Sequence, residues 1–399
     1  MTLVDESREP LRPVVADGDA LGECLDALET AAGPIGFDVE RAHGYRYWPR
    51  AYLLQIRRGH AGTWLIDPTR FDADQLRELV TRTGDEEWII HAASQDLPSM
   101  WEAGIVPPRI FDTELAARLL GKPGVSLGAL LSAELGIELR KAHSAANWAT
   151  RPLQRSWLTY AALDVDFLAE LRDVLDRELR AMRRLTWAEQ EFRHELVEYA
   201  REPEPRVDPW RRTSHVTSVR HPRGLALVRE LWETRDAIAR RRDRPPTHIL
   251  PDRAIVELAQ AAGKDRPVTT RMLGQVEGFT KAPGSRHTRH WRRAIERFAE
   301  LDPSQYPPKR PPRSRDDVPH PRSWPRIDEA AAERWRAVRP AVDELACEIG
   351  IQASLVAPPA ALQQVVWRHA HPTAAHLERA GMRPWQVELL AALLDEVLG

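Results

Sequence analysis

Ile35-Gly-Phe-Asp-Val-Glu40 is the stretch on which the prediction of the fold depends, and we interpret it as a short strand. Two further stretches rich in β-favouring or apolar residues follow it, Tyr52-Leu-Leu-Gln-Ile56 and Thr63-Trp-Leu-Ile66. Glycine or proline residues separate the three stretches. Their spacing along the chain predicts an antiparallel meander.

Helices and strands alternate after this meander. Phe71–Thr83 has helical periodicity, Trp88–His91 is a compact apolar strand, and a helix over Leu97–Ala103 precedes the strand Arg109–Asp112. This order predicts an α/β domain with a mixed sheet flanked by helices. Apolar residues then recur every three or four positions over residues 155–184, which predicts one long amphipathic helix that closes the domain.

The remainder of the chain is predicted to be helical and to divide at its proline-rich stretches. Residues 303–325 contain eight prolines and several arginines, which is typical of an extended linker. The helical regions on either side of it are similar in size, so we interpret them as distant repeats. The expected parts are an α/β domain over residues 1–200, helical domains over 215–302 and 327–399, and a linker over 303–326.

The composition of the 399-residue chain excludes several classes of protein. Apolar residues make up 43% and charged residues 29%, and no apolar run approaches the roughly 18 residues of a membrane span. The N-terminal residues do not resemble a secretory signal. Two cysteines, Cys24 and Cys347, form neither a disulfide framework nor a thiolate metal site. We therefore expect a cytoplasmic protein without a membrane partner.

The net charge of −2 hides an uneven distribution. Residues 201–326 contain 28 basic and 16 acidic residues, a balance of +12, whereas the rest of the chain has 29 basic and 43 acidic residues. Such an asymmetry is typical of a protein that holds nucleic acid through one region. Drift in an arginine-rich sequence from a GC-rich genome is an alternative explanation.

Two carboxylates lie side by side on the first predicted strand. Asp38 and Glu40 are two positions apart, so both side chains point to the same face. Because like charges repel, the pair needs a counter-charge or must take up a proton. A divalent metal ion is the obvious counter-charge, and an exposed edge strand with two solvated acids is the alternative.

Further acidic residues follow in a fixed order. Asp96 comes just after a predicted strand, where it can face a site or cap the next helix. Tyr160 and Asp164 are four positions apart, so they share one face of a helix, either beside a metal-bound water or simply hydrogen-bonded to each other. Four carboxylates taken together form a hard oxygen ligand set, which favours Mg²⁺ or Mn²⁺ over zinc.

This ordered set resembles the tyrosine-bearing branch of the DEDD 3′–5′ exonuclease superfamily, and within it the ribonuclease D family. The resemblance spans about residues 34–170. Its motifs are Phe37-Asp-Val-Glu40, Leu65-Ile-Asp-Pro68, His91-Ala-Ala-Ser-Gln-Asp-Leu97, Arg151-Pro-Leu and Tyr160-Ala-Ala-Leu-Asp164, together with the stretch over residues 45–55. Residues 224–301, with Arg244-Pro-Pro, resemble the helical HRDC domain, and the last 70 residues resemble a diverged second copy.

The resemblance implies a ribonuclease H-like exonuclease domain followed by two HRDC-like domains, and a site that holds two divalent metal ions. It assigns Asp38 to both ions, Glu40 and Asp164 to the tightly held ion, and Asp96 to the second ion. It assigns Tyr160 to the attacking water. The implied reaction is hydrolysis of the terminal phosphodiester of RNA, which releases nucleoside 5′-monophosphates from the 3′ end.

The substrate residues are expected around this site and on the basic region. Gln55 could contact the terminal nucleotide, with core packing as the alternative. His91 could contact the substrate or act as a general base, with a packing or hydrogen-bonding role at the end of the strand as the alternative. Arg240, Arg241, Arg242 and Arg244 could contact phosphates, or form a solvated helix end. We expect a monomer that acts on structured RNA such as tRNA precursors. A 3′–5′ DNA exonuclease, possible because the sequence does not decide sugar preference, and a nucleic-acid-binding scaffold with an inert nuclease domain are the alternatives.

Overall fold

A computed structural model describes residues 2–139, 146–263, 266–310 and 317–399. The chain divides into two compact units. The first unit contains residues 1–41, 50–203 and 317–399, and the second contains residues 42–49 and 204–316. The expected linker over residues 303–326 crosses this division, and its residues 311–316 lie outside the described residues.

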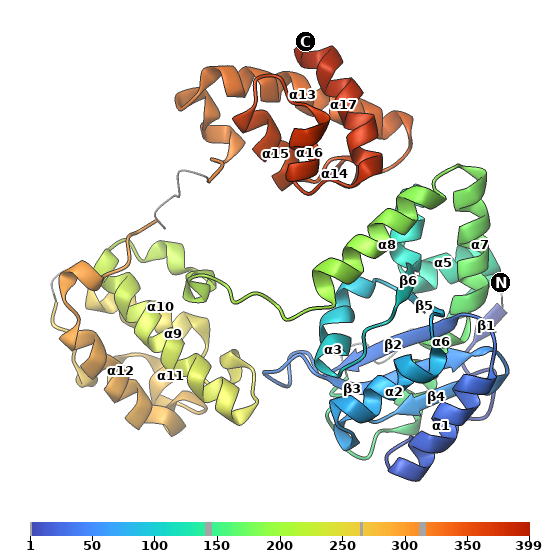
Figure 1. The fold of residues 1–399 in the computed structure, drawn as a ribbon. Helices are drawn as coiled ribbons and strands as arrows, with labels where there is room; N and C mark the ends of the chain where they lie inside the picture. Colours follow the sequence, from blue (N-terminus) through green and yellow to red (C-terminus); the bar gives the residue numbers. More distant parts are fainter. Residues whose placement is uncertain (1, 140–145, 264–265, 311–316) are drawn as a thin grey trace. The chain divides into compact units, whose positions relative to one another are not determined.

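A five-stranded sheet of order β4-β3-β2-β5-β6 forms the centre of the first unit (Figure 1). Strands β2 (Ile35–Arg41), β3 (Ala51–Arg58) and β4 (Gly62–Ile66) are antiparallel neighbours, as the meander predicted. On the other side of β2, strands β5 (Glu87–Ile90) and β6 (Arg109–Asp112) run parallel to it. The prediction of a mixed sheet flanked by helices is therefore confirmed.

The alternation of side chains along β2 separates a core face from a site face. Ile35, Phe37 and Val39 lie in the hydrophobic core that also contains residues of α1 (Gly18–Thr30) and α2 (Ala73–Thr83). The residues between them, including Asp38, point to the other face of the sheet. Helix α6 (Arg155–Asp166) covers this face and contacts β2, β3 and β4.

The predicted single helix over residues 155–184 is wrong, because the chain breaks at Phe167 (φ −119°, ψ 7°) between α6 and α7 (Leu168–Ala181). No proline or glycine marks the break. The buried Asp166 instead pins the end of α6, because its carboxylate accepts hydrogen bonds from the Thr63 hydroxyl at 2.8 Å and the Arg8 backbone at 3.0 Å. These partners are remote in sequence, so helical periodicity alone does not reveal the break.

Helix α8 (Leu185–Tyr199) connects the sheet domain to the C-terminal helices within the first unit. The rings of Trp187 and Trp385 stack with centroids 4.7 Å apart, and Arg383 forms an ion pair of 2.6 Å with the buried Glu191. The C-terminal helices are α13 (Glu329–Glu348), α14 (Ala353–Val356), α15 (Pro359–Arg368), α16 (Ala374–Arg379) and α17 (Pro384–Leu398).

Shorter elements complete the first unit. Strands β1 (Thr2–Val4) and β7 (Ile137–Leu139) form a separate parallel pair. The remaining helices are α3 (Leu97–Glu102), α4 (Thr113–Leu119) and α5 (Leu127–Leu130).

The second unit is helical and encloses its own core, with buried Trp210 and Trp291. Its helices are α9 (Pro222–Arg242), α10 (Asp252–Ala262), α11 (Glu277–Thr280) and α12 (Thr288–Glu300). The loop of residues 42–49, which joins β2 to β3, belongs to this unit. Among the described residues of the whole chain, no helix is both long enough and apolar enough to cross a membrane.

Candidate active site

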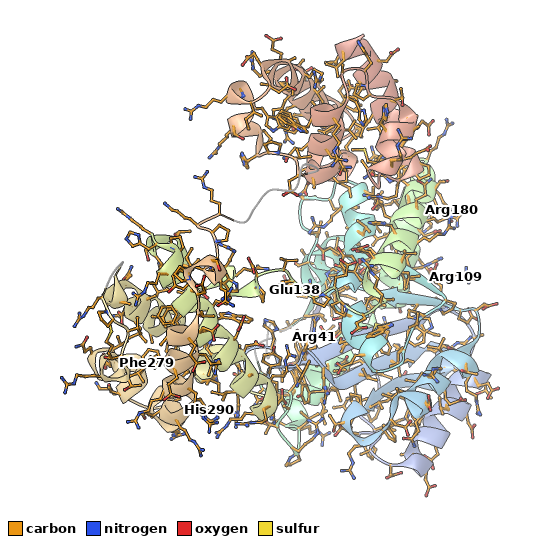
Figure 2. The ribbon with its side chains drawn as sticks, turned by 60° about the vertical axis from the view of Figure 1, so that its left-hand side comes forward. Arg41, Arg109, Glu138, Arg180, Phe279 and His290 are labelled. Carbon is orange, nitrogen blue, oxygen red and sulfur yellow. The ribbon has the colours of Figure 1, made fainter. Side chains whose placement is uncertain are left out.

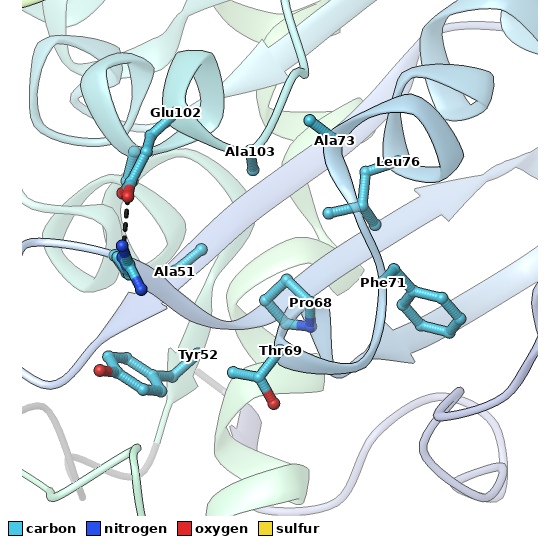
Figure 3. A pocket seen from close by; sticks show the side chains of 11 residues that line it. Ala51, Tyr52, Pro68, Thr69, Phe71, Ala73, Leu76, Glu102 and Ala103 are labelled. Atoms are coloured by element: carbon cyan, nitrogen blue, oxygen red, sulfur yellow. Dashed lines mark hydrogen bonds and ion pairs between the residues drawn. The ribbon is translucent and has the colours of Figure 1, made fainter.

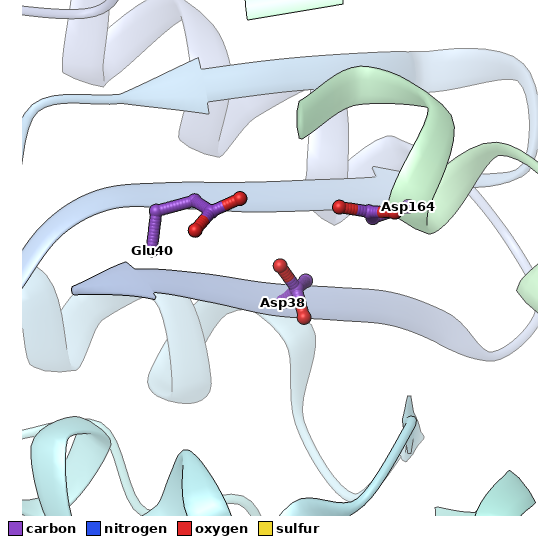
Figure 4. A group of neighbouring side chains, drawn as sticks. All are labelled: Asp38, Glu40 and Asp164. Atoms are coloured by element: carbon purple, nitrogen blue, oxygen red, sulfur yellow. The ribbon is translucent and has the colours of Figure 1, made fainter. Parts of the chain in front are cut away.

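Three carboxylates converge between strand β2 and helix α6. Asp38 and Glu40 extend from the same face of β2, and Asp164 approaches from α6 (Figure 4). One carboxylate oxygen from each residue lies within 4.8 Å of the other two. Residues separated by more than 120 positions therefore form a single acidic cluster, which a sequence pattern can suggest but not place.

Gly36 allows this close approach of helix and strand. It lies two residues before Asp38 on the same face, and a Cβ atom at this position would come within 3.2 Å of the carbonyl oxygen of Val165. This distance is shorter than an ordinary van der Waals contact, so a side chain would push α6 away from β2. The glycine thereby keeps Asp164 close to Asp38.

Burial and mutual repulsion make the cluster hard to ionise. Burial raises the pKa of Asp38 to about 6, although the charge of Arg41 opposes this. Burial, followed by the charges of Asp38 and Asp164, raises the pKa of Glu40 to about 10. Burial and the charge of Asp38 also raise the pKa of Asp164 well above its usual value. A cation placed among these groups would relieve both effects.

Asp96 lies at the start of α3 and is 4% exposed. Its side chain makes no capping hydrogen bond, so the alternative reading as a simple helix cap does not hold. The carboxylate instead pairs with Arg41 at 3.1 Å. Burial and the charge of Asp38 raise the pKa of Asp96 well above its usual value, so Asp96 is electrostatically part of the cluster.

Asp112, which the sequence analysis did not single out, holds the turn that leads to Asp96. Its carboxylate accepts hydrogen bonds from the backbone N–H groups of Ala92 at 3.1 Å and Ala93 at 2.6 Å. Ala92 has a φ of +59°, a conformation that non-glycine residues adopt rarely. The position of Asp112 at the end of β6 is the only sequence signal for this role.

Tyr160 lies one helical turn before Asp164 on α6. Its hydroxyl forms a hydrogen bond with the Asp164 carboxylate, as the spacing of four residues allowed. Burial, followed by the charge of Asp164, raises the pKa of the phenol, so it stays protonated. A neutral phenol beside the cluster can donate a hydrogen bond to a water molecule or accept one from it.

Gln55 lies directly opposite Asp38 in the register of β2 and β3, so both side chains point to the same face. It is fully buried, and both polar atoms of its side chain lack a hydrogen-bond partner among the described residues. An unsatisfied buried amide costs about 1–3 kcal/mol unless a ligand or water completes it. The Gln55 amide therefore has unused hydrogen-bonding capacity on the face that carries Asp38.

Two other predicted substrate residues already have partners in the structure. The Nδ1 atom of His91 lies 2.9 Å from the Thr113 hydroxyl, and burial lowers the pKa of its imidazole. In the second unit, Arg240 pairs with Asp236 at 3.5 Å and lies 5.8 Å from the ring centre of Tyr47. These contacts occupy His91 and Arg240, whereas Arg241, Arg242 and Arg244 extend as exposed side chains.

A cavity of about 300 Å³ lies where β3 begins, between α3 and the segment that enters α2 (Figure 3). Tyr52, Pro68 and Phe71 line it, and an ion pair of 2.8 Å between Arg50 and Glu102 borders it. None of the four predicted carboxylates lines this cavity. It is therefore separate from the acidic cluster.

The acidic cluster has the chemistry of a divalent-cation site. Its three carboxylates supply hard oxygen donors, and Mg²⁺ and Mn²⁺ prefer such ligands. Burial raises the pKa of Asp38, and burial together with neighbouring carboxylates raises the pKa of Glu40, so a bound cation would stabilise the charged forms of both groups. The donor set therefore fits a divalent metal, while the choice between the two ions does not follow from it.

Three family models match consecutive parts of the chain. A 3′-5′ exonuclease model matches residues 14–180, and an HRDC domain model matches residues 224–295. A model described as the 3′ to 5′ exonuclease C-terminal domain matches residues 317–398. This last region is the one in which the sequence suggested a diverged second HRDC-like copy.

Comparisons with whole proteins agree with these matches. Ribonuclease D of Xanthomonas oryzae is 33% identical over 266 residues, which cover 65% of this chain and 71% of the relative. The crystal structure of a protein from Bifidobacterium adolescentis superposes with a TM-score of 0.89 at 31% identity and covers 99% of both chains. Escherichia coli RNase D shares the fold, with a TM-score of 0.70 at 21% identity and 98% of this chain covered. The chain therefore belongs to the ribonuclease D family and is a 3′–5′ exonuclease.

Proposed function

We propose that this enzyme removes nucleotides one at a time from the 3′ end of RNA and releases nucleoside 5′-monophosphates. The observation that carries the proposal is the convergence of Asp38, Glu40 and Asp164 within 4.8 Å beside Tyr160. Membership of the ribonuclease D family supports RNA as the substrate.

Two divalent cations, Mg²⁺ or Mn²⁺, fit this site. Asp38, Glu40 and Asp164 would hold one ion, and Asp38 and Asp96 would hold the other. For Asp96 this requires the Arg41 guanidinium to yield its position, because the two now form an ion pair. When bound, such a pair of ions neutralises charge on the attacking and leaving oxygens of a phosphodiester.

The residues of the chain have separate tasks in this proposal. The Tyr160 hydroxyl, fixed by its hydrogen bond to Asp164, orients the attacking water toward the terminal phosphorus. The amide of Gln55, buried and unpartnered beside Asp38, binds the terminal nucleotide. His91 supports the turn before Asp96 through Thr113, and does not act as a base.

The substrate is proposed to be structured RNA such as tRNA precursors. The helical domains, over residues 215–302 and 327–399, hold its backbone, and the balance of +12 over residues 201–326 supports this role for the first of them. A 3′–5′ DNA exonuclease would use the same cluster, because discrimination between RNA and DNA depends on recognition of the 2′-hydroxyl and not on the metal-binding carboxylates. Hydrolysis of matched RNA and DNA oligonucleotides distinguishes the two: preference for DNA contradicts the proposal.

The variant Asp38→Asn tests the chemistry. It removes one charge and keeps the shape, so we expect metal-dependent nucleotide release to fall by about 10²–10³-fold, the scale of losing a group that stabilises the transition state. Asp173→Asn is the matched control, since Asp173 is an exposed carboxylate on α7. Full activity of Asp38→Asn, or equal activity of wild-type protein with and without a chelator, would reject the metal-dependent mechanism.

A further inference from the structure

A group of unpaired arginines occupies one surface of the second unit. Arg241 and Arg242 lie at the C-terminal end of α9, and Arg289 and Arg293 lie on α12, which packs against α9. All four side chains are exposed. Within the described part of the chain, none of these guanidinium groups forms an ion pair with a carboxylate.

Three other arginines on the same helices are neutralised by carboxylates. Arg235 pairs with Asp252 at 2.6 Å, Arg240 with Asp236 at 3.5 Å, and Arg297 with Glu230 at 3.1 Å. Arg241, Arg242, Arg289 and Arg293 have no such partner among the described residues, and they differ from other unpaired arginines in acting together on His290. Four like charges on two packed helices repel one another, and an anion bound among them converts this repulsion into attraction.

A cavity of about 360 Å³ opens within this group, between α9 and α12. Arg241, His290 and Arg293 are among its lining residues, so two of the four arginines border a recess. Glu233 lines the cavity too, beside Arg297, which its own ion pair neutralises. Figure 2 shows His290 on the surface of this unit.

Two imidazoles lie among these arginines, and each has a ring nitrogen without a hydrogen-bond partner. The Nδ1 atoms of His287 and His290 are buried and have no hydrogen-bond partner among the described residues. The two rings meet edge to face with centroids 6.0 Å apart. Burial, followed by the positive charge of nearby arginines, lowers the pKa of both imidazoles. An anion bound here would supply the missing negative charge.

The spacing of the arginines on α12 suits a polyanion with regular charges. Arg289 and Arg293 are four residues apart, so they share one face and are separated by about 6 Å along the helix axis. This separation is comparable to the distance between successive phosphates along a nucleic-acid strand. Arginine also binds phosphate oxygens in a bidentate manner.

We propose that Arg241, Arg242, Arg289 and Arg293, grouped around His290, form a phosphate-binding site for consecutive phosphodiesters of the RNA strand. The site lies in the second unit and uses no residue of the acidic cluster. It rests on the proposed function, because the RNA bound here is the substrate of the exonuclease. It extends that function to residues of α12, which no sequence motif indicated.

The double variant Arg289→Gln/Arg293→Gln in the full chain tests the site. We measure binding of a fluorescent single-stranded RNA in the presence of a chelator, over a series of salt concentrations. We expect affinity to fall on the order of tenfold and the salt slope to decrease by about 1.4, since each single-strand phosphate contact contributes about 0.7. The charge-matched control is Arg271→Gln/Arg292→Gln, whose residues are exposed, form no ion pair among the described residues and are not among the charges that act on His290.

Hydrolysis of a dinucleotide separates this inference from the proposed function, because so short a substrate needs only the acidic cluster. The double variant should hydrolyse it at the wild-type rate. An unchanged affinity and salt slope for the long RNA would overturn the phosphate site, even if dinucleotide hydrolysis is normal. Failure of the wild-type enzyme to hydrolyse any RNA would instead overturn the proposed function. If poly-aspartate displaces a partner other than RNA from this surface and leaves RNA binding unchanged, that result would also overturn the site.

The imidazoles provide an independent readout. We expect RNA affinity to rise several-fold as the pH falls from about 8 to about 6, because bound phosphate favours the protonated imidazole. His290→Gln should weaken this pH dependence, and an identical pH profile in the variant contradicts the placement of phosphate beside His290. The charged groups that act on the ring are Arg241 and Arg242 on α9, Arg289 and Arg293 on α12, and His287 in the turn Gly284–His287. Glu233 on α9 and Arg297 on α12 line the same cavity.

Discussion

Replacing Asp38 by asparagine should stabilise the metal-free enzyme while it abolishes metal-dependent activity. The reason is that the folded protein holds the Asp38 carboxylate in a setting that penalises its charge. Burial raises its pKa from 3.8 to about 6. One pKa unit corresponds to about 1.4 kcal/mol, so ionised Asp38 destabilises the folded state by at most about 3 kcal/mol.

The pH dependence of this effect has a definite sign. Between about pH 4 and pH 6 the unfolded chain has released the Asp38 proton and the folded chain retains it, so the stability of the metal-free wild-type protein falls as the pH rises. Above about pH 6 the contribution of Asp38 is constant. Asp38→Asn lacks this contribution and should therefore equal the wild type near pH 4 and exceed it at pH 7.5.

Thermal unfolding in a chelator measures the difference. For a unit of this size, 1 kcal/mol corresponds to about 2 °C, so the melting temperature of Asp38→Asn should lie up to about 6 °C above that of the wild type at pH 7.5. Mn²⁺ at 1,000 times its dissociation constant should reverse the order, because it stabilises only the wild type, by about 4.1 kcal/mol. Asp173→Asn controls for loss of an exposed carboxylate.

A metal-free Asp38→Asn protein that is no more stable than the wild type at pH 7.5 would refute this reasoning. That result would mean that ionisation of the Asp38 carboxylate costs no free energy in the folded protein. A cation would then not be needed to offset its charge. Equal stabilisation of both proteins by Mn²⁺ would have the same consequence.

Three further substitutions test the construction of the site. Gly36→Ala should raise the Mn²⁺ concentration needed for half-maximal activity and lower the free energy of unfolding by about 1–3 kcal/mol, because its Cβ atom would displace α6. An unchanged metal titration contradicts this prediction. Gln55→Leu should lower turnover yet preserve or increase the melting temperature, since it removes an unsatisfied buried amide; lost stability with normal turnover would indicate a packing role. Asp112→Asn should destabilise the turn before Asp96, with a larger loss of activity than of melting temperature, whereas wild-type activity would show that the turn needs no charged acceptor.

Local patterns in the sequence were sufficient for the strands and for the face of β2. The two-residue period places Asp38 and Glu40 together, and the structure has this arrangement on the side that α6 covers. The spacing of Tyr160 and Asp164 likewise predicts their hydrogen bond. These predictions succeed because each depends on the geometry of a single element.

Features that depend on contacts between distant elements were not predicted. The break at Phe167 follows from partners of Asp166 in the N-terminal segment and in β4. The role of Asp112 depends on a turn that lies 19 residues earlier in the chain. Arg41 appears in the sequence as an ordinary strand residue, and only the structure shows it paired with Asp96.

The C-terminal helices illustrate the same limit and bear on how the enzyme can be divided. Glu191 on α8 is 4% exposed, and such burial of a carboxylate is tolerable only when partners satisfy it. Its partners are Arg383 at 2.6 Å and the indole N–H of Trp385 at 2.8 Å, which lie more than 190 residues later. Breaking a buried ion pair of this kind costs about 3–5 kcal/mol, and removal of the C-terminal helices would also uncover Trp187. Residues 317–399 are therefore a structural part of the unit that contains the acidic cluster, although the sequence alone presents them as a separate helical region beyond a proline-rich linker.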